Sequence, residues 1–331
     1  MNEFRTVVKL QESDIKISYD STLLFIGSCF SENIGIRFKE RRFSSDINPF
    51  GVLYNPESVR QGLDILMEKR LFSEEQLFDY GGLWHSFYHH SRFSGSDKKR
   101  VLDKINQNII DGHLLLKRTE FLFITFGTAW VYQNTDDGRI VANCHKLPAS
   151  RFKRFRLGVE DIVESYKELT ERLKKFSPGI KIVFTVSPVR HLKDGAHGNQ
   201  LSKSVLLLAV EELVNELKGD VRYFPAYELL MDDLRDYRFY ADDMVHPGNA
   251  AVEYIWTNLS DVYFDKKAKA YVAEIEKIIR ARNHRPFNKN STEYGKFVEN
   301  TLRRLDEIKR QFRGVDIESD ILYFKKMLNR I

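Results

Sequence analysis

A cysteine and a serine stand near the start of the chain, where an apolar run gives way to a helical pattern. Residues 23–26 read as a buried strand and lead into Gly27, Ser28 and Cys29, after which apolar residues recur at helical spacing. The first N–H groups of a helix have no partner within the helix, and they carry its positive end. A thiol or hydroxyl at this point could therefore act as a nucleophile, or its N–H could hold an oxyanion. A plain connection with a serine N-cap would give the same pattern.

A base and a carboxylate follow more than two hundred residues downstream. Asp243 precedes His246 by three residues, and Pro247, which suits the first position of a helix, comes next. A carboxylate at this spacing on a turn can reach the imidazole and fix its tautomer. Together with the first turn, the pair predicts a triad of Cys29 or Ser28, His246 and Asp243 at one edge of a sheet.

Several further motifs strengthen this hypothesis because they occur together. With them, the chain resembles the GSCFA-domain proteins, which are grouped with the SGNH or GDSL-type hydrolases, over residues 20–262. The motifs that carry the resemblance are Gly27-Ser28-Cys29-Phe30-Ser31, Asn48-Pro49-Phe50-Gly51-Val52-Leu53-Tyr54-Asn55-Pro56, Phe126-Gly127-Thr128-Ala129-Trp130-Val131-Tyr132, Val141-Ala142-Asn143-Cys144-His145-Lys146, Ser187-Pro188-Val189-Arg190-His191 and the Asp243/His246 block.

The resemblance implies a fold, a chemistry and a set of site residues. The superfamily implies a flavodoxin-like α/β/α sandwich that hydrolyses or transfers ester-linked acyl groups without a metal. Its first block, laid on this chain without gaps, puts Cys29 at the nucleophile and Ser28 at the aspartate. Its oxyanion glycine corresponds to Gly51, and its third block begins at Gly127.

The third block departs from the superfamily pattern. Ala129 stands where an asparagine would donate to the oxyanion. Loss of one such donor costs on the order of 10²–10³ in rate in other enzymes. Asn48, Asn143 or a backbone amide would have to replace it, or else the chain is a non-catalytic, degenerate-site binding protein.

Aromatic and hydrogen-bonding residues of these motifs predict the kind of substrate. Trp84, Tyr88, Trp130 and Tyr132 offer flat rings suited to sugar faces, and Asn48, Asn143, His145 and Arg190 offer polar groups. We therefore expect a small-molecule, carbohydrate-like acylated substrate and not a long lipid ester. The same aromatic residues would also suit an ordinary core.

No metal, cofactor or disulfide is expected. His85 and His89 are spaced for zinc on a helix, but no third ligand is near in sequence. Cys29 and Cys144 could form one redox pair, although a reducing compartment would keep both as thiols. We expect that compartment to be the cytoplasm, because the first 20 residues mix charges and no apolar run has transmembrane length.

Composition points to an enzyme-sized globular protein. The chain has 331 residues, of which 42% are hydrophobic and 13% aromatic, and its net charge is only +5. This balance indicates neither a nucleic-acid nor a membrane partner. The basic run at residues 151–156 reads as a solvated face, with a phosphate or polyanion partner as the alternative.

Alternating strand and helix patterns predict the fold class, α/β with a mostly parallel sheet covered on both faces. Strands are expected at 23–27, 121–126, 180–186 and 221–224, and helices at 55–69, 98–118, 160–176 and 200–218. A hairpin is expected at 130–144, with its turn at 136–138. Helical stripes without strand signals follow, so we divide the chain into an α/β domain, 1–262, and a C-terminal helical extension, 263–331.

Overall fold

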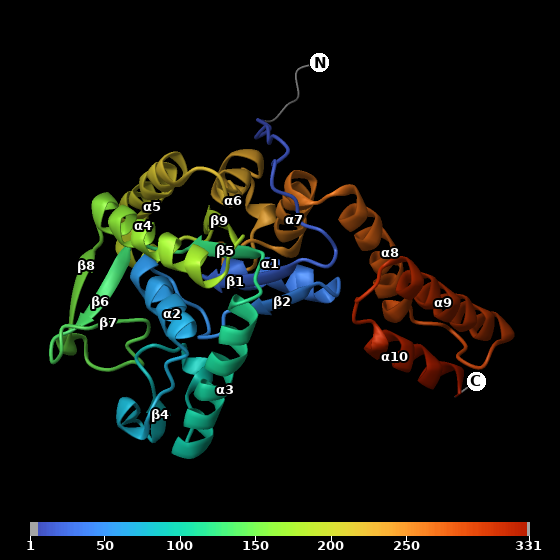
Figure 1. Ribbon diagram of the computed structural model, residues 1–331, viewed down its shortest axis with the longest axis horizontal. Coiled ribbons are helices and arrows are strands. Elements are labelled where there is room, and N and C mark those ends of the chain that lie inside the picture. Colours follow the sequence, from blue (N-terminus) through green and yellow to red (C-terminus); the bar gives the residue numbers. More distant parts are fainter. Residues whose placement is uncertain (1–5, 330–331) are drawn as a thin grey trace.

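Five parallel strands form the central sheet of the computed structural model, which describes residues 6–329 (Figure 1). They are β1 (Thr22–Gly27), β2 (Ser44–Ile47), β5 (Phe121–Phe126), β9 (Lys181–Val186) and β10 (Val221–Tyr223). Their order is β10-β9-β5-β1-β2, and every neighbouring pair is parallel. This is the strand order of flavodoxin-like sheets, as expected.

Alternate side chains of each strand bury themselves on opposite faces of the sheet, as the pleat requires. In β1, Leu23 and Phe25 join one apolar cluster, whereas Leu24 and Ile26 join the other. Helices α1 (Cys29–Glu40) and α7 (Asn249–Tyr263) pack in the first cluster. The second contains α2 (Pro56–Glu68), α3 (Lys98–Leu116), α4 (Val159–Phe176) and α5 (Gly195–Leu217). The α/β/α sandwich is thereby confirmed.

The predicted helices begin at residues that satisfy their free N–H groups. Asn55 caps α2, with its side chain accepting a hydrogen bond from the Ser58 N–H, and Pro56 takes the first helical position. Asp97 caps α3 in the same way. Two short segments were not predicted: β2 is a polar edge strand, and α6 (Ala226–Glu228) is a single turn.

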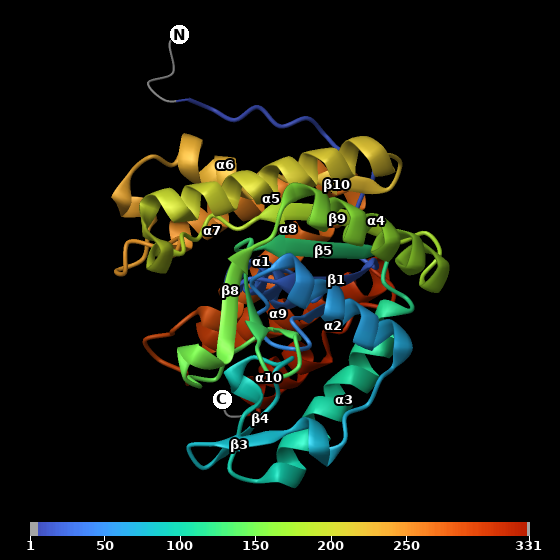
Figure 2. The same ribbon diagram turned by 90° about the vertical axis from the view of Figure 1, so that its left-hand side faces the viewer.

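A smaller antiparallel sheet stands beside the central one (Figure 2). It consists of β6 (Trp130–Asn134), β7 (Ile140–Val141) and β8 (Phe152–Arg156). The β6–β7 pairing confirms the predicted hairpin. The basic run at 151–156, read from sequence as a solvated face, instead supplies β8, which pairs with the other side of β6. A short hairpin, β3 (Phe78–Tyr80) and β4 (Leu83–His85), lies near α3.

Three C-terminal helices lie at the opposite end of the molecule from β6–β8 (Figure 1). They are α8 (Lys266–Asn283), α9 (Thr292–Gln311) and α10 (Glu318–Leu328). Their buried side chains, among them Ile275, Leu305 and Phe324, continue the apolar cluster of α1 and α7. Among the helices described, none is both long and apolar enough to cross a membrane.

Candidate active site

The site lies at the carboxyl edge of the central sheet, where the strand order reverses between β1 and β5. Ligands of open α/β sheets bind at such a point because the loops after the two strands turn to opposite faces and leave a crevice. Gly27 ends β1 with a φ of +136°, and a Cβ on it would lie 2.1 Å from the Thr125 carbonyl oxygen. Only glycine therefore lets the turn between β1 and α1 pass this close to β5.

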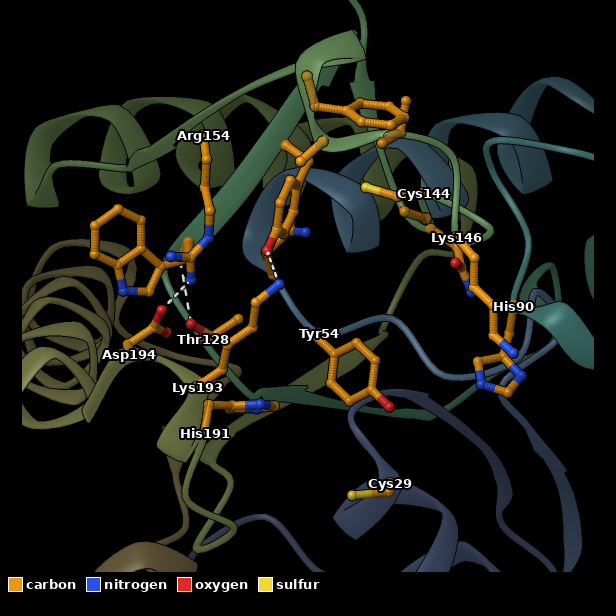
Figure 3. A pocket seen from close by; sticks show the side chains of 18 of the residues that line it. Cys29, Tyr54, His90, Thr128, Cys144, Lys146, Arg154, His191, Lys193 and Asp194 are labelled. Atoms are coloured by element: carbon orange, nitrogen blue, oxygen red, sulfur yellow. Dashed lines mark hydrogen bonds and ion pairs between the residues drawn. The ribbon is translucent and has the colours of Figure 1, made fainter. Parts of the chain in front are cut away.

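A cavity of about 620 Å³ opens at this edge (Figure 3). Loops after four strands contribute Cys29, Tyr54, Asn55, Thr128 and His191, and the small sheet forms a wall with Trp130, Tyr132, Phe152 and Arg154. His246 reaches the cavity from the segment before α7. Chain segments more than two hundred residues apart thus meet around one volume.

Cys29 is the first residue of α1 and lines the cavity. Burial raises the pKa of its thiol, although the N–H groups of Phe30 and of Cys29 itself act in the opposite direction. A helix N-terminus by itself favours the thiolate, but desolvation of the thiolate outweighs the helix end here. A nearby base would therefore be needed for the thiol to ionise readily at neutral pH.

Ser28 does not line the cavity. Ser28 is 1% exposed, and its Oγ has no hydrogen-bond partner within the described structure. Its backbone N–H donates to the Thr125 carbonyl at 3.1 Å, so the residue is fixed against β5. Of the two nucleophile candidates, the structure brings only Cys29 to the cavity.

Asp243 makes three hydrogen bonds in this turn, two of them with His246. Asp243 Oδ2 lies 2.6 Å from His246 Nδ1, and Oδ1 accepts the backbone N–H groups of Val245 and His246, each at 2.9 Å. The two backbone hydrogen bonds, followed by the imidazole contact, lower the pKa of Asp243 to about 2. The carboxylate is thus ionised at neutral pH, and Nδ1 is engaged, which leaves Nε2 to exchange protons. Helix α7 begins at Asn249 with Gly248 as its N-cap, so Pro247 precedes the helix and does not open it.

The predicted oxyanion glycines have no free amide. The Gly51 N–H donates to the Asn48 carbonyl at 2.7 Å, and the Gly127 N–H donates to the Tyr54 carbonyl at 2.8 Å. Neither residue lines the cavity. Both are therefore corrected to structural positions: a tight turn uses the Gly51 N–H, and a contact with the loop after β2 uses the Gly127 N–H.

Asn48 and His145 also lie behind the cavity and not in it. Asn48 is fully buried, and its Oδ1 accepts the Gly27 N–H at 2.8 Å, so it braces the nucleophile turn. His145 is buried with Nε2 2.8 Å from the Ser86 carbonyl, and burial lowers its pKa to about 4. Both side chains are thus placed as supports for the surrounding loops.

Trp130, Asn143 and Arg190 do line the cavity, as predicted, together with Tyr132. Trp84 and Tyr88 do not. They instead lie under the cations Lys98, at 4.5 Å, and Arg139, at 5.2 Å, respectively. Half of the expected aromatic set is therefore available to a ligand.

The histidines considered for zinc are hydrogen-bonded or buried, and the second cysteine is a free thiol. His85 contacts the Ser94 hydroxyl and the Tyr80 carbonyl, and burial lowers the pKa of His89 to about 3. Within residues 6–329, no three His, Cys, Asp or Glu side chains gather as a metal site. Cys144 lines the cavity as a free thiol, and burial raises its pKa to about 11.

Asn55 is a cavity residue that the sequence prediction missed. Its Oδ1 accepts the Ser58 N–H at 2.8 Å, which fixes the orientation of the amide. The opposite end of that amide is an NH₂ group, a donor on a residue that lines the cavity beside Tyr54. Its sequence signals were its place in the motif at 48–56, which carries the resemblance, and an asparagine before Pro-Glu, which helix capping explains fully.

Lys203 is a second missed residue, and it lies beneath the site. Its side chain is fully buried in α5, and Nζ donates to the carbonyls of Gly127 and Ser187, each at 2.6 Å. These carbonyls directly follow β5 and β9, so one ammonium joins the two strand ends. Burial lowers the pKa of Lys203 to about 7. In sequence it is one of many lysines on a helix, with no signal of burial.

Fold and geometry together define a class: a three-layer α/β/α protein with a cysteine at the strand-to-helix turn and a His–Asp pair at the same cavity. The chain belongs to the GSCFA family. The family model matches residues 22–259, and the model described as GSCFA domain protein, C-terminal domain, matches residues 275–330.

Other comparisons are weaker. No curated protein sequence matches the chain. Among solved structures, an acetyl xylan esterase (Est2A) from the rumen bacterium Butyrivibrio proteoclasticus is similar, with 16% identity and a TM-score of 0.27. That match covers 43% of this chain and 36% of the esterase, and no functional argument rests on it.

Proposed function

We propose that this protein is an SGNH-like acyl-ester hydrolase or acyltransferase in which Cys29 is the nucleophile, His246 the general base and acid, and Asp243 its orienting carboxylate. The 2.6 Å contact between Asp243 Oδ2 and His246 Nδ1, at a cavity that Cys29 also lines, carries the proposal. It leaves the free imidazole nitrogen for proton transfer at that cavity.

The reaction would proceed through a thioester. His246 Nε2 takes the thiol proton as Cys29 Sγ bonds to the acyl carbon, and the ester C–O bond then breaks as the leaving oxygen receives that proton. Water or an acceptor hydroxyl next attacks the thioester and gives its proton to His246, and Sγ departs as the thiolate. His246 finally returns the proton to sulfur. The raised pKa of Cys29 makes this base assistance necessary.

We infer that two donors would hold the oxyanion in place of the engaged glycine amides. The Cys29 N–H lies at the free end of α1, and the Asn55 amide presents its NH₂ group on a residue lining the same cavity. Ala129 supplies no side-chain donor, so Asn55 would take the part of the missing asparagine.

The wall of the cavity favours a polar, carbohydrate-like acyl acceptor. Trp130 and Tyr132 present aromatic rings beside Asn143, and the aliphatic residues Val141, Leu147 and Val189 line the cavity alongside them. Flat rings with adjacent hydrogen-bonding groups suit sugar faces. Comparison of turnover for short acyl sugars and long-chain aryl esters tests this preference, and faster turnover of the long chains would contradict it.

The nucleophile is tested with an activated aryl acetate and intact-protein mass spectrometry. Wild-type protein should gain one acetyl group at Cys29 and turn over. Cys29→Ala should lose both signals, while Cys144→Ala serves as the matched thiol control and should keep them. Ser28→Ala should keep most of the activity, since Ser28 is buried. Unchanged turnover in Cys29→Ala would remove this residue from the mechanism.

A non-catalytic binding protein is the second candidate. It is favoured by the engaged amides of Gly51 and Gly127 together with Ala129, which leave the usual oxyanion donors absent. In that case Cys29 would form no acyl adduct with any activated ester, although sugars would still bind. The same mass spectra therefore separate the two functions.

A further inference from the structure

Positive charge dominates the lining of the cavity. Four of its residues are cationic, Lys146, Arg154, Arg190 and Lys193, whereas Asp194 is its one carboxylate. Asp194 pairs with Arg154, and its side chain is 5% exposed. The carboxylate is thus already used, and it is shielded from any ligand.

The remaining three cations have no carboxylate partner among the described residues. Lys193 Nζ donates to the Tyr132 hydroxyl at 3.0 Å, and Arg190 donates to the Met231 sulfur at 3.2 Å. Lys146 is exposed at the rim. Nearby histidines do not change this balance, since burial lowers the pKa of His90 and lowers that of His191 to about 4. The cavity therefore carries an uncompensated positive charge.

The cations lie apart from the nucleophile. In Figure 3, Arg154 of the small sheet and Lys193 of the loop after β9 lie on one side and Lys146 on the other, and Cys29 lies away from all three, on the far side of Tyr54 in this view. Arg154 is also stacked on Trp130 at 4.3 Å, so the cationic and aromatic surfaces are continuous. A ligand whose ring lies on this wall would place one substituent at the cations and another toward Cys29.

We propose that the acylated substrate carries an anionic group, a phosphate or a carboxylate, which Lys193 and Arg190 bind while the ester lies at Cys29. This substrate class rests on the proposed function, but the anion site itself can be measured without turnover. Charge-assisted hydrogen bonds to phosphate or carboxylate oxygens would replace the missing carboxylate partners.

Calorimetric titration of the full chain with glucose 6-phosphate, glucuronate and glucose tests the inference. Both anions should bind more tightly than glucose, and the tighter anion identifies the group. Loss of one charged hydrogen bond should weaken anion binding about tenfold in Lys193→Gln and in Arg190→Gln. Binding should also weaken as salt rises from about 0.05 to 0.5 M.

Lys153 supplies the matched control. It lies on β8 between Phe152 and Arg154, is exposed, and is not part of the cavity lining. Lys153→Gln removes an equal charge from the small sheet beside the cavity and should leave binding unchanged, and Lys193→Arg should retain it. Equal weakening in Lys153→Gln, equal affinity for glucose and its phosphate, or no anion binding at about 10 mM would overturn the proposal.

Turnover distinguishes this inference from the proposed function. Anion binding without an acyl adduct at Cys29 would leave the anion site in place and reject the enzyme. Turnover of neutral acetyl sugars with no preference for their phosphates would support the enzyme and reject the anionic substrate.

Discussion

At the scale of single residues, the site depends on hydrogen bonds that leave one group free for chemistry. Asp243 engages Nδ1 of His246 and leaves Nε2, while Asn55 uses its carbonyl oxygen for capping and leaves its NH₂ group. In both cases a partner fixes the orientation of a side chain without consuming its functional atom. Substitutions that keep the structural bond and remove the functional one can therefore separate the two roles.

Replacement of Asp243 should mainly affect the rate of the chemical step. Asp243→Asn keeps a similar shape but loses the charge that orients His246, and in a comparable triad such a change costs about 10⁴-fold in kcat. We expect a smaller loss, of about 10²-fold or more, because this pair is exposed to solvent. Initial rates with an aryl acetate would show it, and unchanged kcat would exclude Asp243 as the orienting residue.

The pH profile supplies a control for this variant. Because the pKa of Asp243 is about 2, its carboxylate stays ionised above pH 4. An acid limb above that pH must therefore come from another group.

Asn55→Ser tests the proposed oxyanion donor. Serine still caps α2 but has no NH₂ group, so stability should change little while kcat falls by about 10²-fold. Urea denaturation and kinetics are measured on the same preparation. A large loss of stability with unchanged kcat would mean that Asn55 only caps the helix.

At the scale of elements, α5 holds the ends of β5 and β9 together through a buried cation. Lys203 donates to the carbonyl groups that directly follow these strands, and the loops beyond them carry Thr128 and His191 to the cavity. The Lys203 side chain thus joins the ends of β5 and β9, from which two loops reach the cavity.

Lys203 should make stability depend on pH. Its pKa falls from 10.5 to about 7 on burial, so between these values the unfolded chain binds more protons than the folded chain. Stability of the native state must therefore rise with pH in this window, by at most about 1.4 kcal/mol per pH unit. Below pH 7 the full cost of the buried charge is present.

Denaturation of wild type and Lys203→Met between pH 7 and 9 measures this effect. The variant should lack the slope, and exposed Lys175→Met should keep it. A wild type without any additional slope would contradict the buried, charge-shifted state of Lys203.

At the scale of the whole molecule, the C-terminal helices are attached to the sandwich by an apolar cluster and one buried acid. Asp320 of α10 is 1% exposed and accepts hydrogen bonds from Arg42, at 2.8 Å, and Arg282, at 2.7 Å. These helices lie at the opposite end of the molecule from β6–β8 in Figure 1, and none of their described residues lines the cavity.

Asp320→Asn should destabilise the fold by about 3 kcal/mol, because it leaves two guanidinium groups without their shared carboxylate. Burial raises the pKa of Asp320, but the hydrogen bonds from Arg42 and Arg282 outweigh it, and the net pKa is lowered. Its stabilisation is therefore present above the unfolded pKa and is lost as pH falls below that value. Urea denaturation at pH 7 and pH 3 should show the gap to wild type narrowing at low pH.

Exposed Asp316 offers a control near Asp320. Asp316→Asn should change stability by less than about 0.5 kcal/mol. Kinetics with an aryl acetate should remain unchanged in both variants, because neither position reaches the cavity. Equal destabilisation by the two substitutions would argue against the buried ion pair.

Local sequence pattern determined the fold class, the four apolar strands and four of the long helices of the sandwich. It also determined the positions of Cys29, Asp243 and His246. These features depend on residues close in sequence: apolar periodicity, helix caps, and a carboxylate three residues from a histidine. Polar strands such as β2 and β8 escaped prediction because their residues pair with a neighbour that only the tertiary fold supplies.

Only the tertiary structure decided which candidates reach the cavity. Ser28 and Cys29 are neighbours in sequence, yet the close passage of Gly27 against β5 buries Ser28 and leaves Cys29 lining the cavity. The Gly51 N–H is engaged in a turn and the Gly127 N–H by the distant Tyr54 carbonyl, and the Lys203 ammonium finds its partners at the ends of two distant strands. Burial and hydrogen-bond partners depend on contacts between remote segments, and residue identity and spacing do not encode those contacts locally.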